Sequence, residues 1–553
     1  NSTTSSKFVH RRPLMTKPSA HTDSADQHED RHSSEHTDEA ISPALLRALG
    51  EVSEKEEAEH ARQHEDQVLE VSEIISTAAS FYEKVRYMVD YREDHTIRRN
   101  ATERILKRKL LLEGKVPSGA DLLQELVEGK YLPQEEATES AVRGTTAAIA
   151  DYAKLIREAR LSQTEARPLI SFAASEIDAF LSPLAYAVDT SVARAMYETI
   201  RPKFDAPRVR PEVIDVQLLC AVWRALLRAD NESLAYALWR LSPLKWRGEG
   251  EGTTLSPEEI KRAIRSISAA VKNDLQWEFV PKIKNEAIYF HVVKALFLEE
   301  KSSSEHTLQY PDKIADFTRE FLEKKFEQEN QRIKRSGIRA VIYLLCTKLF
   351  LVAALEWPYE AFILKHVNYV PLAINAFFHP LLLLALTRKV GFPGEDNTEA
   401  VIAGVQNAVR GKVRPIVIRS SSSRNLFVFG LVYLVMTIGL FGAILGVLQA
   451  FEFNILGGTL FLFFLALVMY FAFRIRYRAS QWRVTKDERP LAVLGSVLTT
   501  PIIHAGRWLS RTFSSVNILV LVMDFIIETP FKYLLDFSHQ FLRYLREKAD
   551  DLY

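Results

Sequence analysis

Four long apolar runs in the second half of the chain limit what it can fold into. A helix needs about 20 mostly apolar residues to cross the hydrocarbon core of a bilayer. The last two runs contain no charged residue, the first contains Lys348, and the second contains two prolines. We therefore predict four transmembrane helices. The runs are Ile338–Leu355, Val370–Leu386, Leu426–Phe451 and Ile455–Phe473.

The segments that connect these runs alternate in charge. The segment before the first run, "RIKRSGIR", is basic, and the next connection, "EWPYEAFILKHVNY", has one Lys against two Glu. The long connection between the second and third runs is basic again, and the short turn "QAFEFN" carries no positive charge. Because cytoplasmic loops collect Lys and Arg, the alternation predicts four crossings with the amino-terminal part inside.

The fourth run ends in the basic stretch "RIRYRASQWRVTKDER". A cytoplasmic position explains why so many positive charges follow an apolar segment. We expect Arg474, Arg476 and Arg478 to meet lipid headgroups there. The whole chain has a net charge of only +1, so the total charge indicates no partner.

The part of the chain before the first run divides into two. Residues 1–45 are polar and His/acid-rich, with too few large apolar residues to offset the entropy of ordering, so we expect a disordered tail. They contain no signal-peptide core. Residues 46–336 show helical periodicity and no strand alternation of useful length, which predicts a soluble, all-helical cytoplasmic domain. In it, Ser256, Pro257 and Glu259 form a predicted capping box.

The chain after the fourth run is basic and amphipathic. We assign residues 337–474 to the membrane domain and residues 475–553 to a basic loop followed by interfacial or re-entrant helices. Pro501 interrupts the first short apolar piece and Asp524 lies in the second. If both pieces crossed, Arg507 and Arg511 between them would lie outside, so a crossing at 491–527 is not favoured. Arg543 and Arg546 belong to an amphipathic end that fits either lipid phosphates or a helix packed on the protein's own domain.

Ionisable residues at membrane depth are the main candidates for chemistry. Charged groups inside a bilayer are costly and usually face a partner or a water-filled path. Two interpretations fit: a transport or proton pathway, or structural pairing, in which Lys348 snorkels or pairs with Asp524. The candidates are Lys348, Glu356, His379, Asp524 and Glu528.

Small residues in the third run indicate close helix packing. Such residues at small-xxx-small spacing let two membrane helices approach closely. The partner is either the fourth span, through Gly457 and Gly458, or another copy of the chain. The residues are Gly439, Gly442, Ala443 and Gly446.

The known chemical motifs are not found. The sequence has no HExxH and no CxxC, and the spaced histidines of "HEDRHSSEH" and "HARQH" suit a solvated acidic segment better than a metal site. "GVQNAVRGK" has six residues between its glycines and no Ser or Thr after Lys412, so it is not a phosphate loop. Cys220 and Cys346 are expected to be buried free thiols. We expect no metal and no cofactor.

One basic segment raises the question of nucleic-acid binding. "IRRNATERILKRKLLLEGK" lacks the interleaved aromatic residues that bind single strands by stacking, so a helix with a buried apolar face and solvated charges is favoured. Nucleic acid is therefore not an expected partner.

Two stretches resemble segments of multi-pass membrane proteins of small-genome bacteria. They are "FYEKVRYMVDYREDHTIRRNATERILKRKLLL" and "GRWLSRTFSSVNILVLVMDFIIETPFK". The resemblance implies a bacterial cytoplasmic membrane and an integral membrane protein. It implies no activity, ligand or catalytic residue.

The sequence favours a non-enzymatic membrane scaffold or adaptor with an unidentified protein partner, and a homo-oligomer is compatible with it. A transporter or channel that uses the intramembrane ionisable residues is the alternative, and a membrane enzyme ranks third. We also predict that one long helix joins the soluble domain to the first span, because only Gly337 weakens the helical pattern there and a lone Gly costs about 1 kcal/mol.

Overall fold

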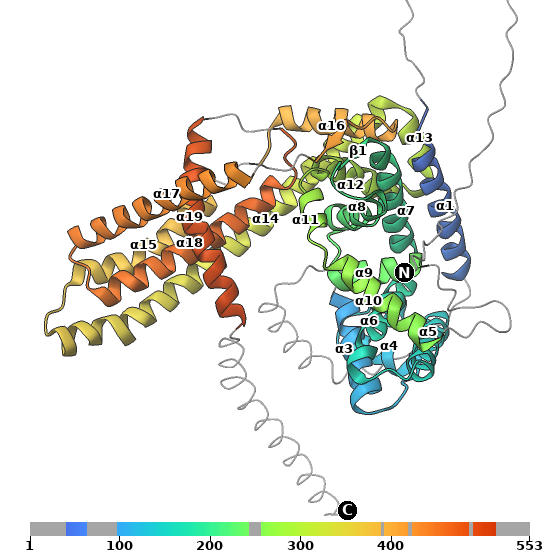
Figure 1. Ribbon diagram of the computed structural model, residues 1–553, viewed down its shortest axis with the longest axis horizontal. Helices are drawn as coiled ribbons and strands as arrows, with labels where there is room; N and C mark the ends of the chain where they lie inside the picture. Colours follow the sequence, from blue (N-terminus) through green and yellow to red (C-terminus); the bar gives the residue numbers. More distant parts are fainter. Residues whose placement is uncertain are drawn as a thin grey trace, which may run out of the picture. The chain divides into compact units, whose positions relative to one another are not determined.

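The computed structural model is predominantly helical and describes six stretches of the chain (Figure 1). The predictions for the His/acid-rich tail, for the spaced histidines and for the carboxyl-terminal amphipathic end lie largely or wholly outside them. The described residues are 40–63, 97–242, 256–388, 392–418, 423–485 and 490–515.

The first half of the helical domain surrounds one apolar core. Leu122, Tyr152, Phe172 and Trp239 are among its fully buried side chains. The predicted capping box is confirmed: the Ser256 side chain accepts a hydrogen bond from the Glu259 backbone N–H, and Glu259 bonds back to Ser256. The helices are α3 (Ile97–Lys107), α4 (Gly119–Glu128), α5 (Glu139–Glu158), α6 (Gln163–Leu181), α9 (Asn231–Leu241) and α10 (Pro257–Val271), with π-helical η3 (Arg108–Leu112) after α3 and the 3₁₀ turn η4 (Gln134–Glu136) before α5.

Helix α3 differs in one respect from the expected helix with solvated charges. Ile105 and Leu106 are buried as expected. Arg99 is buried as well, where it forms ion pairs with Glu103 at 3.0 Å and Asp230 at 2.8 Å. The segment thus uses one of its cations inside the domain, since a buried charge needs such partners.

A second core continues the domain towards the membrane helices. It includes residues 401–409 and Ile416, which lie between the second and third apolar runs of the sequence. Gly404 of this segment packs against the ring of Tyr289, so its role is close helix contact. The elements are α1 (Pro43–Gln63), α7 (Pro183–Ile200), η5 (Arg201–Lys203), α8 (Pro211–Leu226), α11 (Leu275–Phe279), α12 (Lys284–Glu299), η6 (Lys301–Ser303), α13 (Ser304–Gln309) and α16 (Glu395–Val409).

The strands in the described residues form one short parallel pair. Strand β1 (Phe204–Asp205) pairs with β2 (Ile416–Val417), and Phe204 lies opposite Ile416. The pair attaches the segment after α16 to the middle of the helical domain. For the part of the chain that the structure describes, the all-helical prediction holds apart from the four residues of these strands.

Among the described residues, four helices are long and apolar enough to cross a membrane. They lie at the approximate positions of the four predicted spans, and the crossing of a membrane by each stays a prediction. They are the carboxyl-terminal part of α14 (Pro311–Leu351) with its extension to Leu364, α15 (Tyr369–Arg388), α17 (Ser423–Ala450) and α18 (Ile455–Ser480). We call the end of these helices at residues 365–368 and 451–454 the turn end, and the opposite end the domain end.

Helix α14 continues without a break from the helical domain into the first span, as predicted. It has 41 residues, and Ile314 and Ile333 are buried along it. The helix continues through Gly337, where a Cβ atom would lie 3.4 Å from Thr387 of α15, in ordinary van der Waals contact.

We expect spin labels at Lys324→Cys and Tyr343→Cys, both exposed on α14, to give a narrow distance distribution centred at about 28 Å, from a rise of 1.5 Å per residue. The exposed Cys346 is replaced by serine in this variant, while the buried Cys220 stays. A broad distribution would show that the chain bends at Ser336–Gly337.

The domain end of α18 is attached to the helical domain by residues that we call the joint: Trp482, Asn397 and their contacts. Trp482 is buried in the second core, with ring centroids 5.1 Å from His291 and 5.7 Å from Phe321. The buried Asn397 side chain donates to the Trp482 carbonyl at 3.0 Å and accepts from the backbone N–H groups of Val484 at 2.8 Å and Thr485 at 3.2 Å. The joint thus gives the membrane helices a second attachment, besides α14.

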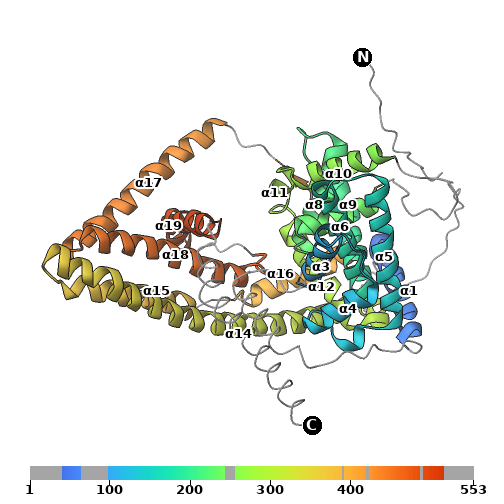
Figure 2. The same ribbon diagram turned by 90° about the horizontal axis from the view of Figure 1, so that it is seen from below.

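Helix α19 (Pro490–Ser515) continues through Pro501, so the interruption expected there is not seen. Figures 1 and 2 show it lying across α18. The contact is close because Gly506 has no side chain: a Cβ atom there would lie 2.0 Å from the Ala466 carbonyl oxygen. It is not among the four candidate spans. An in-plane or re-entrant position for 491–527 remains a prediction.

Candidate functional site

The first span ends in two π-helical segments, η7 (Val352–Glu356) and η8 (Tyr359–Leu364). Pro358 lies between them and has no N–H to donate to the preceding turn, so the regular hydrogen-bond pattern cannot continue. The wider turns place both Glu356 and Glu360 on the inner face of the helices, where they are buried. Local π-helical turns are frequent at functional sites.

A buried hydrogen-bonded triad joins the first and second spans. The Lys348 ammonium donates to Asn375 Oδ1 at 2.7 Å, and Asn375 Nδ2 donates to Glu356 Oε1 at 2.6 Å. Lys348 and Asn375 are fully buried and Glu356 is 2% exposed. The ammonium also lies 4.1 Å from the centroid of the Phe464 ring, which provides a cation–π contact. The amide thus connects a cation and a carboxyl group that the fold keeps away from lipid.

His379 lies one helical turn after Asn375 and is fully buried. Its Nε2 is 2.9 Å from the carbonyl oxygen of Phe461, which assigns the proton to Nε2 because a carbonyl can only accept. The ring is enclosed by Phe378, Phe461 and Phe464. Within the described residues, Nδ1 has no hydrogen-bond partner. In this tautomer, Nδ1 of His379 is a buried acceptor.

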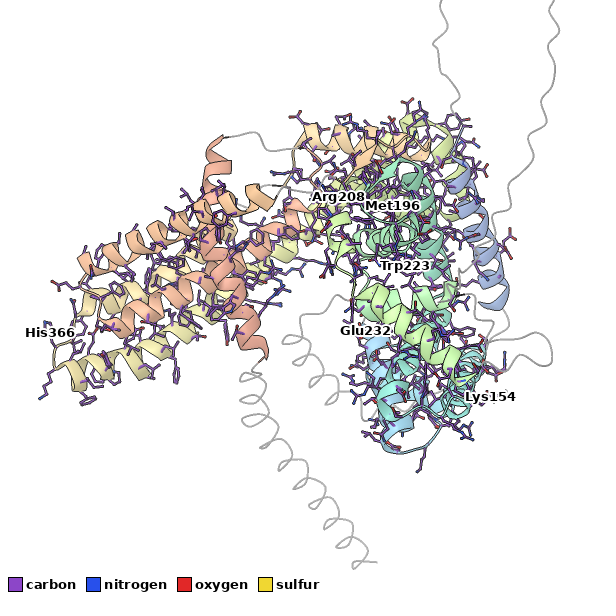
Figure 3. All side chains as sticks on the ribbon, in the orientation of Figure 1. Lys154, Met196, Arg208, Trp223, Glu232 and His366 are labelled. Carbon is purple, nitrogen blue, oxygen red and sulfur yellow. The ribbon has the colours of Figure 1, made fainter. Side chains whose placement is uncertain are left out.

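Polar side chains continue from the triad to the turn end. Glu360 accepts from the Asn368 backbone N–H at 2.9 Å and from Asn454 Nδ2 at 2.6 Å. Asn368 Nδ2 donates in turn to Glu452 at 3.0 Å. These bonds tie the loop that contains His366, labelled in Figure 3, to the turn between the third and fourth spans.

An apolar layer follows the polar residues on the domain side. Leu383, Val468 and Ala472 are buried there, packed against Val341 and Leu344 of α14. Towards the turn end, Asn375 Nδ2 donates to the Gly457 carbonyl at 3.3 Å, and the Gly457 N–H donates to Asn454 Oδ1 at 2.7 Å, which connects the triad to Glu360. Apolar side chains separate the triad from the domain end.

The structure brings together three of the five ionisable candidates, Lys348, Glu356 and His379. Asp524, Glu528, Arg543 and Arg546 lie outside the described residues, as does the side chain of Arg478. Arg474 and Arg476 are exposed near the domain end of α18. Cys220 is a buried free thiol as expected, and burial raises its pKa to about 11. Cys346 is exposed, contrary to expectation, because its face of α14 has no packing partner within the described chain.

Sequence reasoning missed Asn375 and Glu360. Both are separated by four residues from a candidate that was named, His379 and Glu356 respectively, and residues four apart share a helix face. That spacing was the available signal. It could not show that Asn375 bridges Lys348 and Glu356, because the three residues lie on two helices.

The small-residue stripe of α17 points away from the other described helices. No atom lies within 4 Å of a Cβ built on Gly439, Gly442 or Gly446, and Ala443 is exposed. Packing against the fourth span is therefore not seen at these positions. Figure 2 shows α17 diverging from α18 beyond the turn that joins them. Packing against another copy of the chain remains a prediction.

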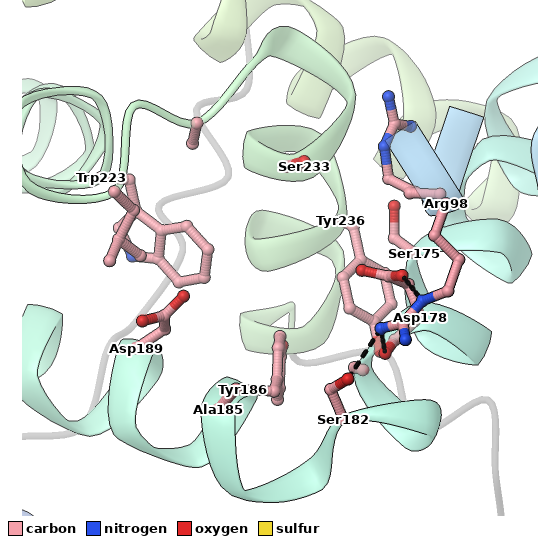
Figure 4. A pocket seen from close by; sticks show the side chains of 14 residues that line it. Arg98, Ser175, Asp178, Ser182, Ala185, Tyr186, Asp189, Trp223, Ser233 and Tyr236 are labelled. Carbon is pink, nitrogen blue, oxygen red and sulfur yellow. Dashed lines mark hydrogen bonds and ion pairs between the residues drawn. The ribbon is translucent and has the colours of Figure 1, made fainter. Parts of the chain in front are cut away.

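The helical domain contains a separate hollow of about 310 Å³ (Figure 4). Tyr186, Tyr236 and Trp223 contribute to its wall. At one end Arg98 donates to Asp178 at 2.7 Å and to Ser182 at 2.8 Å. The Arg98 guanidinium is thus hydrogen-bonded, and Asp178 balances its charge. The hollow therefore has aromatic walls and no excess of positive charge at this end.

Neither a metal-ligand cluster nor a known relative points to an activity. The described residues contain no group of three His, Cys, Asp or Glu side chains that could hold a metal ion. Compared with protein-family models, with curated proteins and with solved structures, the chain matches none of them. Any function must therefore be inferred from the geometry of the chain itself.

Proposed function

We propose that the protein is a non-enzymatic integral membrane scaffold that holds its helical domain rigidly at the cytoplasmic face, in a bacterial cytoplasmic membrane. The observation that carries the proposal is the double attachment of the domain. Helix α14 enters the first span without interruption, and the joint fixes the end of the fourth span through Trp482 and Asn397. A flexible tether needs neither feature, whereas a domain that positions a partner at a fixed height and orientation needs both.

The charge at the domain end supports the cytoplasmic orientation. Arg474 and Arg476 are exposed there, and Arg335 and Arg339 are exposed on α14. The turn end has Lys365, but also Glu360 and Glu452, so it carries no comparable excess of positive charge. The proposal places the basic end inside.

The third span supports an assembly with further copies of the chain. Helix α17 buries little of its surface in the described residues, and its small-residue stripe faces open space. A second copy could bring an equivalent stripe into close contact, since small residues permit it. The scaffold would then present two or more helical domains side by side.

The test is mass photometry and affinity capture of the full chain extracted in mild detergent. We expect an oligomer that Gly439→Leu/Gly446→Leu converts to a monomer, because leucine prevents the close approach. Gly430→Leu, an exposed position on the same helix, is the matched control and leaves the oligomer intact. A monomeric wild type that captures no protein from the membrane extract would contradict the scaffold proposal.

A second candidate function is an ion or proton pathway, which the Lys348–Asn375–Glu356 triad and the adjacent His379 favour. Ionisable groups buried at membrane depth commonly line such pathways. The apolar layer at Leu383 and Val468 would have to open for passage. Proton flux into liposomes that is unchanged by Lys348→Met and His379→Phe would contradict this function.

A further inference from the structure

Three elements of the helical domain place cations against the last residues of the fourth span. Lys284, at the start of α12, donates to the Ser480 carbonyl at 3.3 Å. Arg228, in the loop after α8, donates to the Gln481 side chain. Lys325 of α14 lies with its ammonium 5.9 Å from the Trp482 ring centroid. With Arg483, which follows directly, these residues form what we call the cation cluster.

Two cations of this cluster, Lys284 and Lys325, are not paired with a carboxylate within the described part of the chain. Burial lowers the pKa of Lys284, and the Arg483 charge lowers it further. Burial also lowers the pKa of Lys325. The negative charge of Glu329 raises this pKa, and the positive charges of Arg228 and Arg332 lower it. Cations that the fold holds together in this way provide a site where an anion would relieve their repulsion.

The pKa of His291 is also lowered, by burial and by nearby positive charges. His291 packs edge-on against Trp482. Burial, followed by the charges of Lys294, Lys325 and Arg228, lowers its pKa to about 3. It is therefore neutral at ordinary pH and adds no charge to the cluster. Lys294 is itself paired with the Asp189 carboxylate.

The position of the cluster identifies the class of anion. The fourth candidate span ends at Tyr477, and Ser480 is three residues further along α18, a distance of about 5 Å at 1.5 Å per residue. The headgroup layer on each side of a bilayer is about 5–8 Å thick. If α18 crosses a membrane, the cluster lies at the level of the lipid phosphates. Basic sites beside the ends of membrane helices bind anionic lipid headgroups.

We propose that the cation cluster binds the phosphate of an anionic phospholipid at the joint. Lys284 and Lys325 supply ammonium donors, and Arg228 and Arg483 supply guanidinium groups, whose forked donors suit phosphate oxygens. The lipid would connect the helical domain to the bilayer at the point where Trp482 and Asn397 already connect it to α18. Such a lipid site requires only that α18 spans the membrane, and it is independent of whether the protein is a scaffold.

The test is titration of the detergent-solubilised full chain with three probes, with bound molecules counted by native mass spectrometry. The probes are short-chain phosphatidylglycerol, short-chain phosphatidylcholine and inorganic phosphate. We expect phosphatidylglycerol to bind at least about tenfold more tightly than either of the other two. Equal binding of inorganic phosphate would show a soluble phosphate site and overturn the lipid assignment. Equal binding of phosphatidylcholine would show that the anionic charge is not recognised.

Two double variants locate the site. Lys284→Gln/Lys325→Gln is expected to weaken phosphatidylglycerol binding about tenfold. The matched control, Lys282→Gln/Lys324→Gln, removes the same charge from exposed neighbours outside the cluster and is expected to leave binding unchanged. Equal losses in both variants would mean that binding follows overall charge, and the proposal would be wrong. Unchanged helicity by circular dichroism confirms that each variant is folded.

Discussion

Replacing Asn375 with leucine should destabilise the folded protein by about 3–6 kcal/mol, because hydrogen bonds to charged groups contribute about 1.5–3 kcal/mol each and this residue makes two such bonds. Its Oδ1 accepts from the Lys348 ammonium and its Nδ2 donates to Glu356. Both partners are buried, so the substitution leaves each without its bridge. The measurement is the free energy of unfolding in mixed micelles, titrated with sodium dodecyl sulfate.

Two further variants separate the bridge from general effects of mutation. Thr347→Val, next to Lys348 but bonded only within its own helix, is expected to be nearly neutral. The triple variant Lys348→Met/Glu356→Leu/Asn375→Leu should recover most of the lost stability, since replacing a whole buried polar network with apolar groups removes the stranded charges. If Asn375→Leu alone costs less than about 1 kcal/mol, the triad contributes no more than an ordinary hydrogen bond.

Replacing Trp482 with alanine should cost about 3–5 kcal/mol, the range for removing a large aromatic side chain from a core. The indole is 5% exposed and contacts His291 and Phe321. We also expect the fourth span to lose its fixed position relative to the domain. Spin labels at Ala403→Cys on α16 and Tyr477→Cys on α18, both exposed positions, are placed in a chain whose exposed Cys346 is replaced by serine. They should give a narrow distance distribution in that chain and a broad one when Trp482→Ala is added.

Trp508→Ala is the matched control, because Trp508 is 66% exposed on α19 and outside the joint. It should change neither stability nor the width of the distribution. A distribution that stays narrow in Trp482→Ala would show that α14 alone orients the domain, and the joint would then have no mechanical role.

The elements that sequence analysis predicted correctly depend on nearby residues. The apolar runs have the length that a bilayer requires, so their positions follow from composition alone. The capping box at Ser256 and the uninterrupted α14 likewise follow from residues within a few turns of each other. At Gly337 the small cost of a glycine was weighed correctly against helical propensity on both sides.

The features that were missed depend on contacts between distant segments. Residues 401–409 were assigned to the membrane domain, yet they contribute to the core of the helical domain. Sequence patterns could not show this packing, because Tyr289 and Phe290 of α12 are more than a hundred residues away in sequence. The partner of Lys348 was missed for a similar reason, because Asn375 lies on another helix. Pro501 was expected to interrupt a helix, but packing of α19 on α18 around Gly506 outweighs the loss of one hydrogen bond.

The length of α14 makes it a lever arm. Its 41 residues give a rod about 60 Å long at 1.5 Å per residue. Membrane helices change their tilt when the hydrocarbon thickness changes. If the first span tilted by about 10°, the far end of such a rod would move by about 10 Å, from the helix length and the sine of the angle. Because Trp482 is held in the domain core, the fourth span would have to tilt together with the first. A change in bilayer thickness would then change the position of the helical domain relative to the membrane.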